Sequence, residues 1–417
     1  MFKYFVIVAG LIGSCAPALW ADDWGHWRGY LGNGVSLQAQ PPTEFSDSKN
    51  LVWKATIPGR GSGSPTIWGD RVFVVTAVAT NGKTPGELAF QTLCFDRGSG
   101  ELRWKKTAVE AVPHEGTHAT NGYASASPCT DGTHVYSHFG SRGLYCYTMD
   151  GELVWKRDDF GPMSTRNSFG EGSSPTLADD LIIVPWDHEG PSFLYALNKT
   201  TGETAWKVAR DEPTCWATPL VINVGATKQV VMNGQTYARA YDLKTGQELW
   251  RCSGQTERPA ASAVSDGELV FVTSGFRGAF LGAFRPSGRG DIQGTSSVVW
   301  TIDRDTPDVA SPLLSKGRLY FYKGKSGLLT CVDAKTGKPH YEAQRIPGVS
   351  STYASPVAAG GFVYLTDRSG TITVIKDSDR LEIVASNTLS EPVDATPAPV
   401  DNQLFIRSEN SLFCFSK

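Results

Sequence analysis

A short motif, Ser-Pro or a close variant of it, returns eight times along the chain, and its spacing limits the folds that this sequence can adopt. The motif starts at Ser64, Ser127, Ser174, Thr218, Ser262, Ser311, Ser355 and Thr396, and most spacings are 41 to 49 residues. Self-similarity at roughly 40 to 50 residues is typical of radial or stacked repeats, in which each unit is one small sheet that cannot bury its faces alone. The period therefore predicts a repeat protein built from small sheets.

Each unit also ends on a shared pattern, in which an acid or amide stands eight residues before an aromatic residue. The clearest copies are DRGSGELRW, NKTTGETAW, DLKTGQELW and DAKTGKPHY, at 96–104, 198–206, 242–250 and 333–341. Asp or Asn opens a turn, Gly supplies the positive φ that closes a hairpin, and the aromatic residue returns on the next strand to pack against the neighbouring unit. Apolar runs on both sides of these turns indicate four strands per unit. Pro at the start of the innermost strand suits an edge that faces a central channel.

The two ends of the chain complete the count of strands. Residues 51–54 (LVWK) resemble the fourth strand of a unit but precede the first Ser-Pro. After Thr396, the runs 404–406 and 412–415 give two more strands, and the chain stops without a fourth. We therefore predict an all-β fold, an eight-bladed β-propeller of four-stranded antiparallel blades that is closed by an N-terminal strand. Closure removes the unpaired edges that an open ring would expose.

The Asp-x-x-x-Gly-x-x-x-Trp ends and the Ser-Pro starts resemble the pyrroloquinoline quinone (PQQ)-like propeller repeat, over about residues 51–417. Residues 24–36 resemble the opening of secreted propellers from planctomycete-type bacteria. The PQQ-like family includes quinone-dependent alcohol dehydrogenases and non-catalytic propellers similar to BamB, an outer-membrane protein assembly lipoprotein. The resemblance implies the fold and leaves the activity open, because one fold hosts many functions.

The first residues predict export. Lys3, the apolar run 5–12 and Ala-Pro-Ala at 16–18 are typical of a signal peptide, which we assign to residues 1–21. An N-terminal extension at 22–50 and the propeller at 51–417 follow. Residues 11–15 also resemble an imperfect lipobox, so a lipid anchor at Cys15 is the alternative to plain cleavage. Because no apolar stretch reaches 18 residues, we predict a periplasmic or secreted protein without a membrane span.

Charge argues against a nucleic-acid-binding protein, and the cysteine pattern argues against disulfides at four repeat positions. Removal of residues 1–21 takes away one Lys and no acid, so the formal net charge changes from −3 to −4. Since Lys and Arg are scattered among acids, nucleic-acid binding is not expected. Four of the seven remaining cysteines occupy a repeat position that is Ala in other blades, which predicts small buried residues rather than disulfides. These four are Cys94, Cys146, Cys331 and Cys414, whereas Cys129, Cys215 and Cys252 stay open.

Binding residues are expected on one face of the ring. The turns between first and second strands and between third and fourth strands are tight, whereas the opposite face carries irregular loops, the usual seat of binding. Aromatic residues and arginines in such loops are typical interface anchors, and the alternative is that they satisfy each other's hydrogen bonds. The candidates for the binding face are His118, Asn121, Tyr123, Arg166, Asn167, Trp186, Asp187, His188, Arg210, Trp216 and Arg277.

One motif and one family alternative bear on whether the chain holds a metal or a cofactor. His114-Glu115-Gly116-Thr117-His118 matches the zinc-protease pattern, but Pro113 and Gly116 are incompatible with the helix that this chemistry needs. A quinone-dependent dehydrogenase implies a cofactor between a Trp and a vicinal disulfide, with Ca²⁺ held by carboxylates and amides. The sequence has no adjacent cysteines and no run of alternating acids. We therefore predict neither a metal nor a cofactor, and PQQ with calcium is the disfavoured alternative.

These observations favour a non-catalytic, exported propeller that serves as a BamB-like scaffold for a protein partner in the cell envelope, in outer-membrane protein assembly or a related role. A quinone-dependent alcohol dehydrogenase-like enzyme is one alternative, and a propeller that senses a small ligand in its central mouth is another. The scaffold hypothesis predicts that alanine at Arg166, Trp186 or Arg210 weakens association without altering thermal stability.

Overall fold

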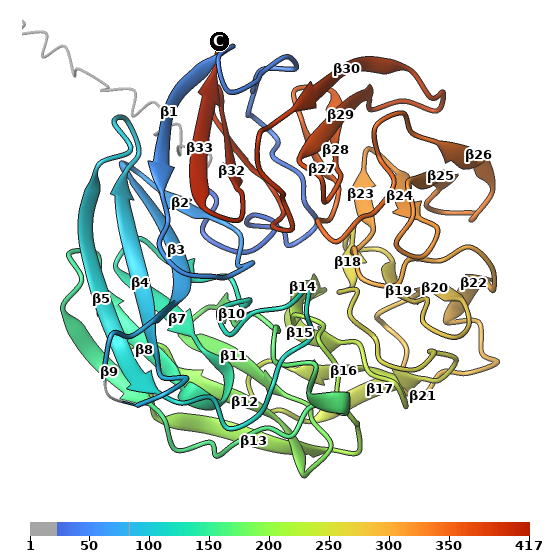
Figure 1. Cartoon of the computed structure of the whole chain (residues 1–417). Helices are drawn as coiled ribbons and strands as arrows, with labels where there is room; N and C mark the ends of the chain where they lie inside the picture. The colour runs from blue at the N-terminus through green and yellow to red at the C-terminus, as the bar shows by residue number, and fades with distance from the viewer. Residues whose placement is uncertain (1–22, 83) are drawn as a thin grey trace, which may run out of the picture.

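Eight antiparallel sheets surround a central axis in the computed structural model, which describes residues 23–82 and 84–417 (Figure 1). The predicted eight-bladed propeller with four-stranded blades is confirmed. Helix in this part of the chain is restricted to two 3₁₀ turns, η1 (Gly140–Arg142) and η2 (Arg166–Ser168).

Each blade except the last takes its strands in chain order from the centre outward. Blade 1 contains β2 (Thr66–Trp68), β3 (Arg71–Ala79), β4 (Leu88–Asp96) and β5 (Leu102–Ala111). Blade 2 contains β6 (Cys129–Thr130), β7 (His134–His138), β8 (Leu144–Thr148) and β9 (Leu153–Arg157). Blade 3 contains β10 (Thr176–Ala178), β11 (Leu181–Trp186), β12 (Ser192–Asn198) and β13 (Thr204–Arg210). Blade 4 contains β14 (Leu220–Val224), β15 (Thr227–Met232), β16 (Ala238–Asp242), β17 (Glu248–Cys252) and a fifth strand, β21 (Gly290–Asp291).

The second half of the ring repeats this order. Blade 5 contains β18 (Val264–Ser265), β19 (Val270–Ser274), β20 (Phe280–Phe284) and β22 (Val298–Ile302). Blade 6 contains β23 (Leu313–Ser315), β24 (Arg318–Tyr322), β25 (Leu328–Asp333) and β26 (Pro339–Arg345). Blade 7 contains β27 (Val357–Ala359), β28 (Phe362–Thr366), β29 (Thr371–Lys376) and β30 (Ile383–Thr388). Blade 8 contains β31 (Ala398–Val400), β32 (Gln403–Arg407), β33 (Ser411–Ser416) and β1 (Leu51–Thr56).

Blade 8 joins the two ends of the propeller. Strand β1 pairs with β33 in antiparallel register, from Leu51 opposite Phe415 to Thr56 opposite Ser411. Figure 1 shows the blue β1 beside the red β33. The predicted closure by an N-terminal strand is therefore confirmed, and the ring has no open blade.

The repeated Ser or Thr of the Ser-Pro motif forms a closed ring of hydrogen bonds around the channel. The backbone N–H of each such residue donates to the hydroxyl oxygen of its counterpart in the next blade, at 2.8 to 3.1 Å. The last bond runs from the Thr396 N–H back to the Ser64 hydroxyl, at 3.0 Å. The motif thus recurs because each copy satisfies a buried backbone donor of the preceding blade.

Removing one hydroxyl from this ring should leave one buried donor unsatisfied. In Ser311→Ala, the Ser262 N–H loses an acceptor that lies 2.9 Å away. Ser311 and Ser262 are both buried, so we expect the free energy of unfolding to fall by about 1–3 kcal/mol. Urea denaturation measures the change. An unchanged unfolding midpoint would contradict a structural role for the ring.

The Gly and Trp of the repeat join five of the eight blades to the next blade. Trp155 of blade 2 donates from Nε1 to the Lys199 carbonyl of blade 3, at 3.0 Å. Gly202 of the same turn has φ +76°, and a Cβ there would lie 2.8 Å from the Trp155 ring. The glycine is therefore required both for its backbone conformation and for the close approach of the ring. Equivalent contacts join Trp53 to Gly100, Trp104 to Gly151, Trp206 to Gly246 and Trp300 to Gly337.

Blade 4 departs from the predicted pattern. Its Trp250 donates instead to the Gln229 side chain of the same blade, at 3.0 Å. Blade 5 has no tight turn between its last two strands, because residues 285–297 form a longer connection. Strand β21 in this connection pairs in parallel with β17, so it covers the outer edge of blade 4 as a fifth strand.

The segment at 24–35 lies across one end of the channel, on the face with the tight turns, which we call the turn face. Trp24 bridges to Ile67 of blade 1, and Val35 bridges to Ala358 of blade 7. Between them, the buried Arg28 donates to the Pro312 carbonyl of blade 6. The N-terminal extension is thus part of the packed structure. The predicted signal peptide and Cys15 lie outside the described residues.

All seven described cysteines are buried and free. Burial raises the pKa of the Cys94 thiol, and likewise that of Cys146, to about 12. The interpretation of the repeated cysteines as small buried residues is confirmed, and Cys129, Cys215 and Cys252 form no disulfide. Among the described residues, no helix has the length and apolar character needed to cross a membrane.

Candidate functional site

A cavity of about 420 Å³ occupies the centre of the ring. Each blade contributes the residue that stands two positions before its Ser-Pro or equivalent. Eight residues line the cavity in this way, namely Ser62, Ser125, Gly172, Trp216, Ala260, Val309, Tyr353 and Asp394. Chemistry at this level of the channel is therefore set by one position per blade.

The cavity has a floor and a mouth. Trp27, from the segment that crosses the turn face, lines its bottom. Several members of the hydroxyl ring, such as Ser127 and Thr218, line its wall. The remaining lining residues come from the loops between blades and between second and third strands, which form the opposite face, here called the loop face. A ligand would therefore enter from the loop face.

The mouth combines aromatic rings with cations. Arg258 lies over the Phe276 ring, with 3.5 Å between the guanidinium carbon and the ring centroid, and 5.3 Å from the Phe169 centroid. On the other side, Arg368 lies 4.1 Å and Lys325 5.5 Å from the Tyr353 centroid. Such stacking stabilises a cation while it leaves the rest of its surface open to a ligand.

Three of the predicted binding residues line this cavity. Trp216 donates from Nε1 to the Gly170 carbonyl at 2.7 Å, which holds its ring against the wall. Asn121 donates to the Phe169 carbonyl at 2.9 Å and accepts from the Ser125 hydroxyl at 2.6 Å. His118 packs edge-on against Phe169, with the ring centroids 4.8 Å apart. The structure thus brings His118, Asn121 and Trp216 together.

Tyr123 lies instead beside a smaller cavity of about 40 Å³, which also holds most of the zinc-protease-like motif. Its hydroxyl donates to the Glu115 carbonyl at 3.1 Å. His114 contacts the Met163 carbonyl through Nε2, at 2.6 Å, whereas His118 lines the central cavity. The two imidazoles therefore point to different cavities, and the motif forms a loop as predicted. Within residues 23–82 and 84–417, no group of three or more His, Cys, Asp or Glu is placed to hold a metal ion.

Arg166, Asn167 and Arg277 are exposed on the loop face. The side chain of Arg277 is 70% exposed and lies 3.6 Å from Glu257, and Arg166 lies 3.6 Å from Glu189. Ion pairs as open as these contribute little to stability. Both arginines therefore remain accessible on the loop face.

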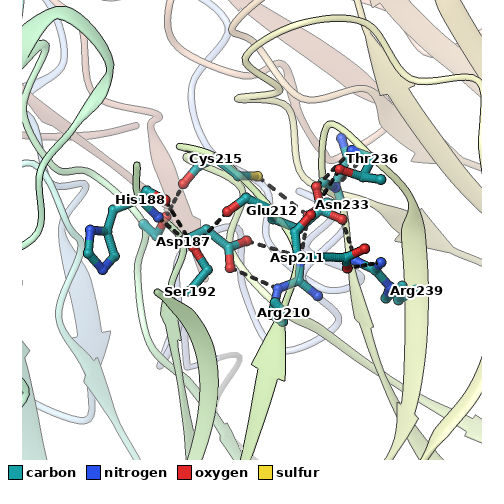
Figure 2. Close-up of polar contacts among 12 residues, drawn as sticks. Asp187, His188, Ser192, Arg210, Asp211, Glu212, Cys215, Asn233, Thr236 and Arg239 are labelled. Atoms are coloured by element: carbon teal, nitrogen blue, oxygen red, sulfur yellow. Dashed lines mark hydrogen bonds and ion pairs between the residues drawn. The ribbon is translucent and has the colours of Figure 1, made fainter. Parts of the chain in front are cut away.

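Four other predicted residues lie in the interior, which corrects the expectation that they anchor a partner. Trp186, Asp187, His188 and Arg210 are all buried. Arg210 forms a two-pronged ion pair with Asp187, at 2.8 and 3.0 Å (Figure 2). The ring of His188 accepts from the Ser164 N–H at 3.2 Å, and burial lowers its pKa. The alternative, that such residues satisfy each other's hydrogen bonds, describes them correctly.

The buried pair belongs to a polar network between blades 3 and 4. Arg210 also donates to the Tyr241 hydroxyl at 2.8 Å. Nearby, Arg239 contacts Glu212, whose carboxylate also accepts from the Thr236 N–H at 2.7 Å (Figure 2). Every charge in this network has a partner of opposite sign, so the network stabilises the contact between two blades rather than a ligand.

Five residues of the mouth had not been predicted from the sequence, namely Arg258, Phe276, Lys325, Tyr353 and Arg368. The loop with Arg258 and Pro259 was not recognised as part of the loop face. For Tyr353, a signal was present, because it stands two residues before Ser355, as Trp216 does before Thr218. Counting back from each Ser-Pro would have identified the lining of the channel.

The carboxylates of the cavity already have partners. Asp394 pairs with Arg368 at 2.6 Å, and Asp308 pairs with Lys325 at 3.3 Å. The Asn121 amide is engaged by backbone groups and by Ser125. A calcium ion prefers six to eight oxygen ligands, several of them carboxylates. The donors that line this cavity do not fit a calcium–quinone pair.

The sequence of the chain matches the model of a known protein family. The model of the family described as "Outer membrane protein assembly factor BamB" matches residues 89–293 and 236–416. A search of the curated proteins finds no match.

Solved structures with a similar fold differ in what their names say of function. BamB from Moraxella catarrhalis is 14% identical, with a TM-score of 0.58 over 88% of this chain and 99% of that one. Quinohemoprotein alcohol dehydrogenase from Comamonas testosteroni is 10% identical, with a TM-score of 0.63 over 95% of this chain and 80% of that one. The computationally designed protein Ika8 is 11% identical, with a TM-score of 0.56 over 87% of this chain and all of that one. At these identities the likeness concerns the fold alone. The family match spans most of the propeller, and the chain belongs to the BamB family of PQQ-like β-propellers.

Proposed function

We propose that this protein is a non-catalytic, exported propeller that binds a protein partner in the cell envelope through its loop face, in outer-membrane protein assembly or a related role. The observation that carries the proposal is the composition of that face. Exposed arginines in open ion pairs surround a mouth lined by aromatic rings. Arginine and aromatic residues are enriched at protein interfaces, where they supply most of the binding energy.

The turn face offers fewer features that a protein partner could bind. Its hairpins are tight, and the segment at 24–35 covers the end of the channel on that side. The loop face therefore presents both a cavity and positive charge to a partner. Acidic segments of a partner would complement the arginines there.

A quinone-dependent dehydrogenase receives less support. The solved dehydrogenase, like the solved BamB, shares only the fold with this chain. The paired carboxylates of the cavity leave few free ligands for calcium. A scaffold needs none of these groups, and it is the simpler account of the same face.

The test is capture of the partner from its native envelope after mild cross-linking. We expect the double variant Arg166→Ala/Arg277→Ala to lose the partner at least tenfold in yield, because the energetic anchors of an interface are few. Both side chains are exposed, so thermal stability should stay the same.

Lys335→Ala is the matched control. Its side chain is 70% exposed, as that of Arg277 is, and it forms a similarly open pair with Glu268, at 3.5 Å. It belongs to a tight turn of blade 6, on the turn face. Loss of the partner in Lys335→Ala, or equal capture by the double variant and the wild type, would contradict binding through the loop face.

A further inference from the structure

One cation in the mouth of the central cavity lacks a counter-ion. The side chain of Arg258 stacks on Phe276 and approaches Phe169. Among the described residues, none forms an ion pair or hydrogen bond with its guanidinium; only its backbone N–H has a partner, the Gln235 side chain at 3.1 Å. Five N–H donors at the mouth are therefore free for an acceptor that comes from outside.

The neighbouring charges favour an anion beside the Arg258 guanidinium. Asp308 and Asp394 are the two carboxylates that line the cavity, and each is paired with another cation, Lys325 or Arg368. Burial lowers the pKa of Arg258, as do the nearby guanidinium groups of Arg277 and Arg166. The carboxylates of Asp308 and Glu257 oppose this shift, but each already forms an ion pair with another cation, Lys325 or Arg277. A bound anion would relieve both effects, since an unpaired and partly desolvated cation is unfavourable.

The aromatic walls of the cavity indicate which chemical group would accompany the anion. Trp216, Phe169 and Tyr353 line the same cavity as Arg258, with Trp27 at the floor. Ligand sites of this size are mostly apolar, with a few polar groups that orient the ligand. A planar guanidinium matches the two oxygens of a carboxylate, and the aromatic walls match an apolar group beside it.

We propose that the mouth of the channel binds a carboxylate that carries an aromatic or apolar group, with the Arg258 guanidinium as its receptor. The ligand is either a small free acid or the C-terminal end of a peptide, which share this chemistry. The proposal does not depend on the scaffold function, because it concerns the cavity and not the exposed arginines around it.

The backbone at Arg258 makes a clean test available. Its φ is 53°, in the left-handed region, where asparagine and glycine are tolerated better than arginine. Strained residues of this kind cluster at functional sites. In Arg258→Asn the charge is lost while the backbone conformation is favoured, so the fold should be retained.

The experiment is isothermal titration calorimetry of the full chain with N-acetylphenylalanine and, as matched probe, N-acetylphenylalanine amide. We expect the acid to bind and the amide to bind at least tenfold more weakly. In Arg258→Asn, affinity for the acid should fall by roughly 10- to 100-fold, the range of one charge-assisted pair. The melting temperature should be equal to or above that of the wild type. Lys335→Ala should bind as the wild type does.

A pair of peptides that end in phenylalanine, one as the free acid and one as the amide, distinguishes the two sources. Tighter binding of the peptide acid than of N-acetylphenylalanine supports a chain end, and binding of the small acid alone supports a free metabolite. Equal binding of acid and amide, an unchanged affinity in Arg258→Asn, or no binding of either acid to the wild type would overturn the proposal. A second variant, Trp216→Phe, should weaken binding of acid and amide alike, because it alters the wall and not the receptor.

Discussion

Arg210→Ala should lower the free energy of unfolding by about 3–5 kcal/mol, because it leaves the Asp187 carboxylate charged and unpaired in the interior. Both side chains are almost fully buried, and Arg210 also contacts Tyr241 and Asn233 of blade 4. This expectation reverses the one drawn from sequence, in which Arg210 was exposed and its loss left stability unchanged. Urea denaturation with a two-state analysis measures the difference.

The double variant Arg210→Met/Asp187→Leu is the informative control. Replacing a buried ion pair by apolar residues of similar size is often neutral, whereas removing one partner is costly. We therefore expect the double variant to regain most of the stability that Arg210→Ala loses. A double variant as unstable as the single one would show that the Tyr241 and Asn233 contacts of Arg210, at 2.8 and 3.3 Å, matter more than its charge.

The architecture was predictable because each of its rules repeats. Gly202 and Trp206 stand four residues apart for the same reason as Gly151 and Trp155, so the period reveals a turn, a strand and a packing contact together. The closing strand was recognisable because residues 51–54 lacked a unit of their own. Repetition averages out the local irregularities that obscure single elements.

The site was less predictable, because burial depends on where a loop folds back. Trp186, Asp187 and Arg210 stand at strand ends next to irregular loops, and in sequence they are indistinguishable from exposed anchors. The ring of Ser and Thr hydroxyls was likewise invisible, since a hydroxyl that bonds a neighbouring blade has no partner nearby in the sequence. By contrast, the position two residues before each Ser-Pro keeps a constant geometry, so the channel lining could have been predicted from Trp216 and Tyr353.

The second large effect is expected at the closure of the ring. Trp53 lies on β1, donates from Nε1 to the Arg97 carbonyl of blade 1 at 2.9 Å, and packs on Gly100. It therefore attaches the last blade to the first. Trp53→Ala should cost about 3–5 kcal/mol, the usual range for a buried Trp.

Trp206→Ala separates closure from ordinary blade packing. Trp206 is as buried as Trp53, at 9% and 8% exposure, and donates to the Leu243 carbonyl at the same 2.9 Å. It belongs to β13, which follows β12 directly in the chain, whereas β1 is held to β33 from the opposite end of the chain. Loss of Trp53 removes the contacts of β1 with blade 1 and with the Phe405 ring of blade 8. We therefore expect the pairing of β1 with β33 to open more often. Amide hydrogen exchange should show protection lost in β1 and β33 of Trp53→Ala, and retained there in Trp206→Ala. Full protection of β33 in both variants would mean that the backbone pairing of β1 alone is sufficient to close the ring.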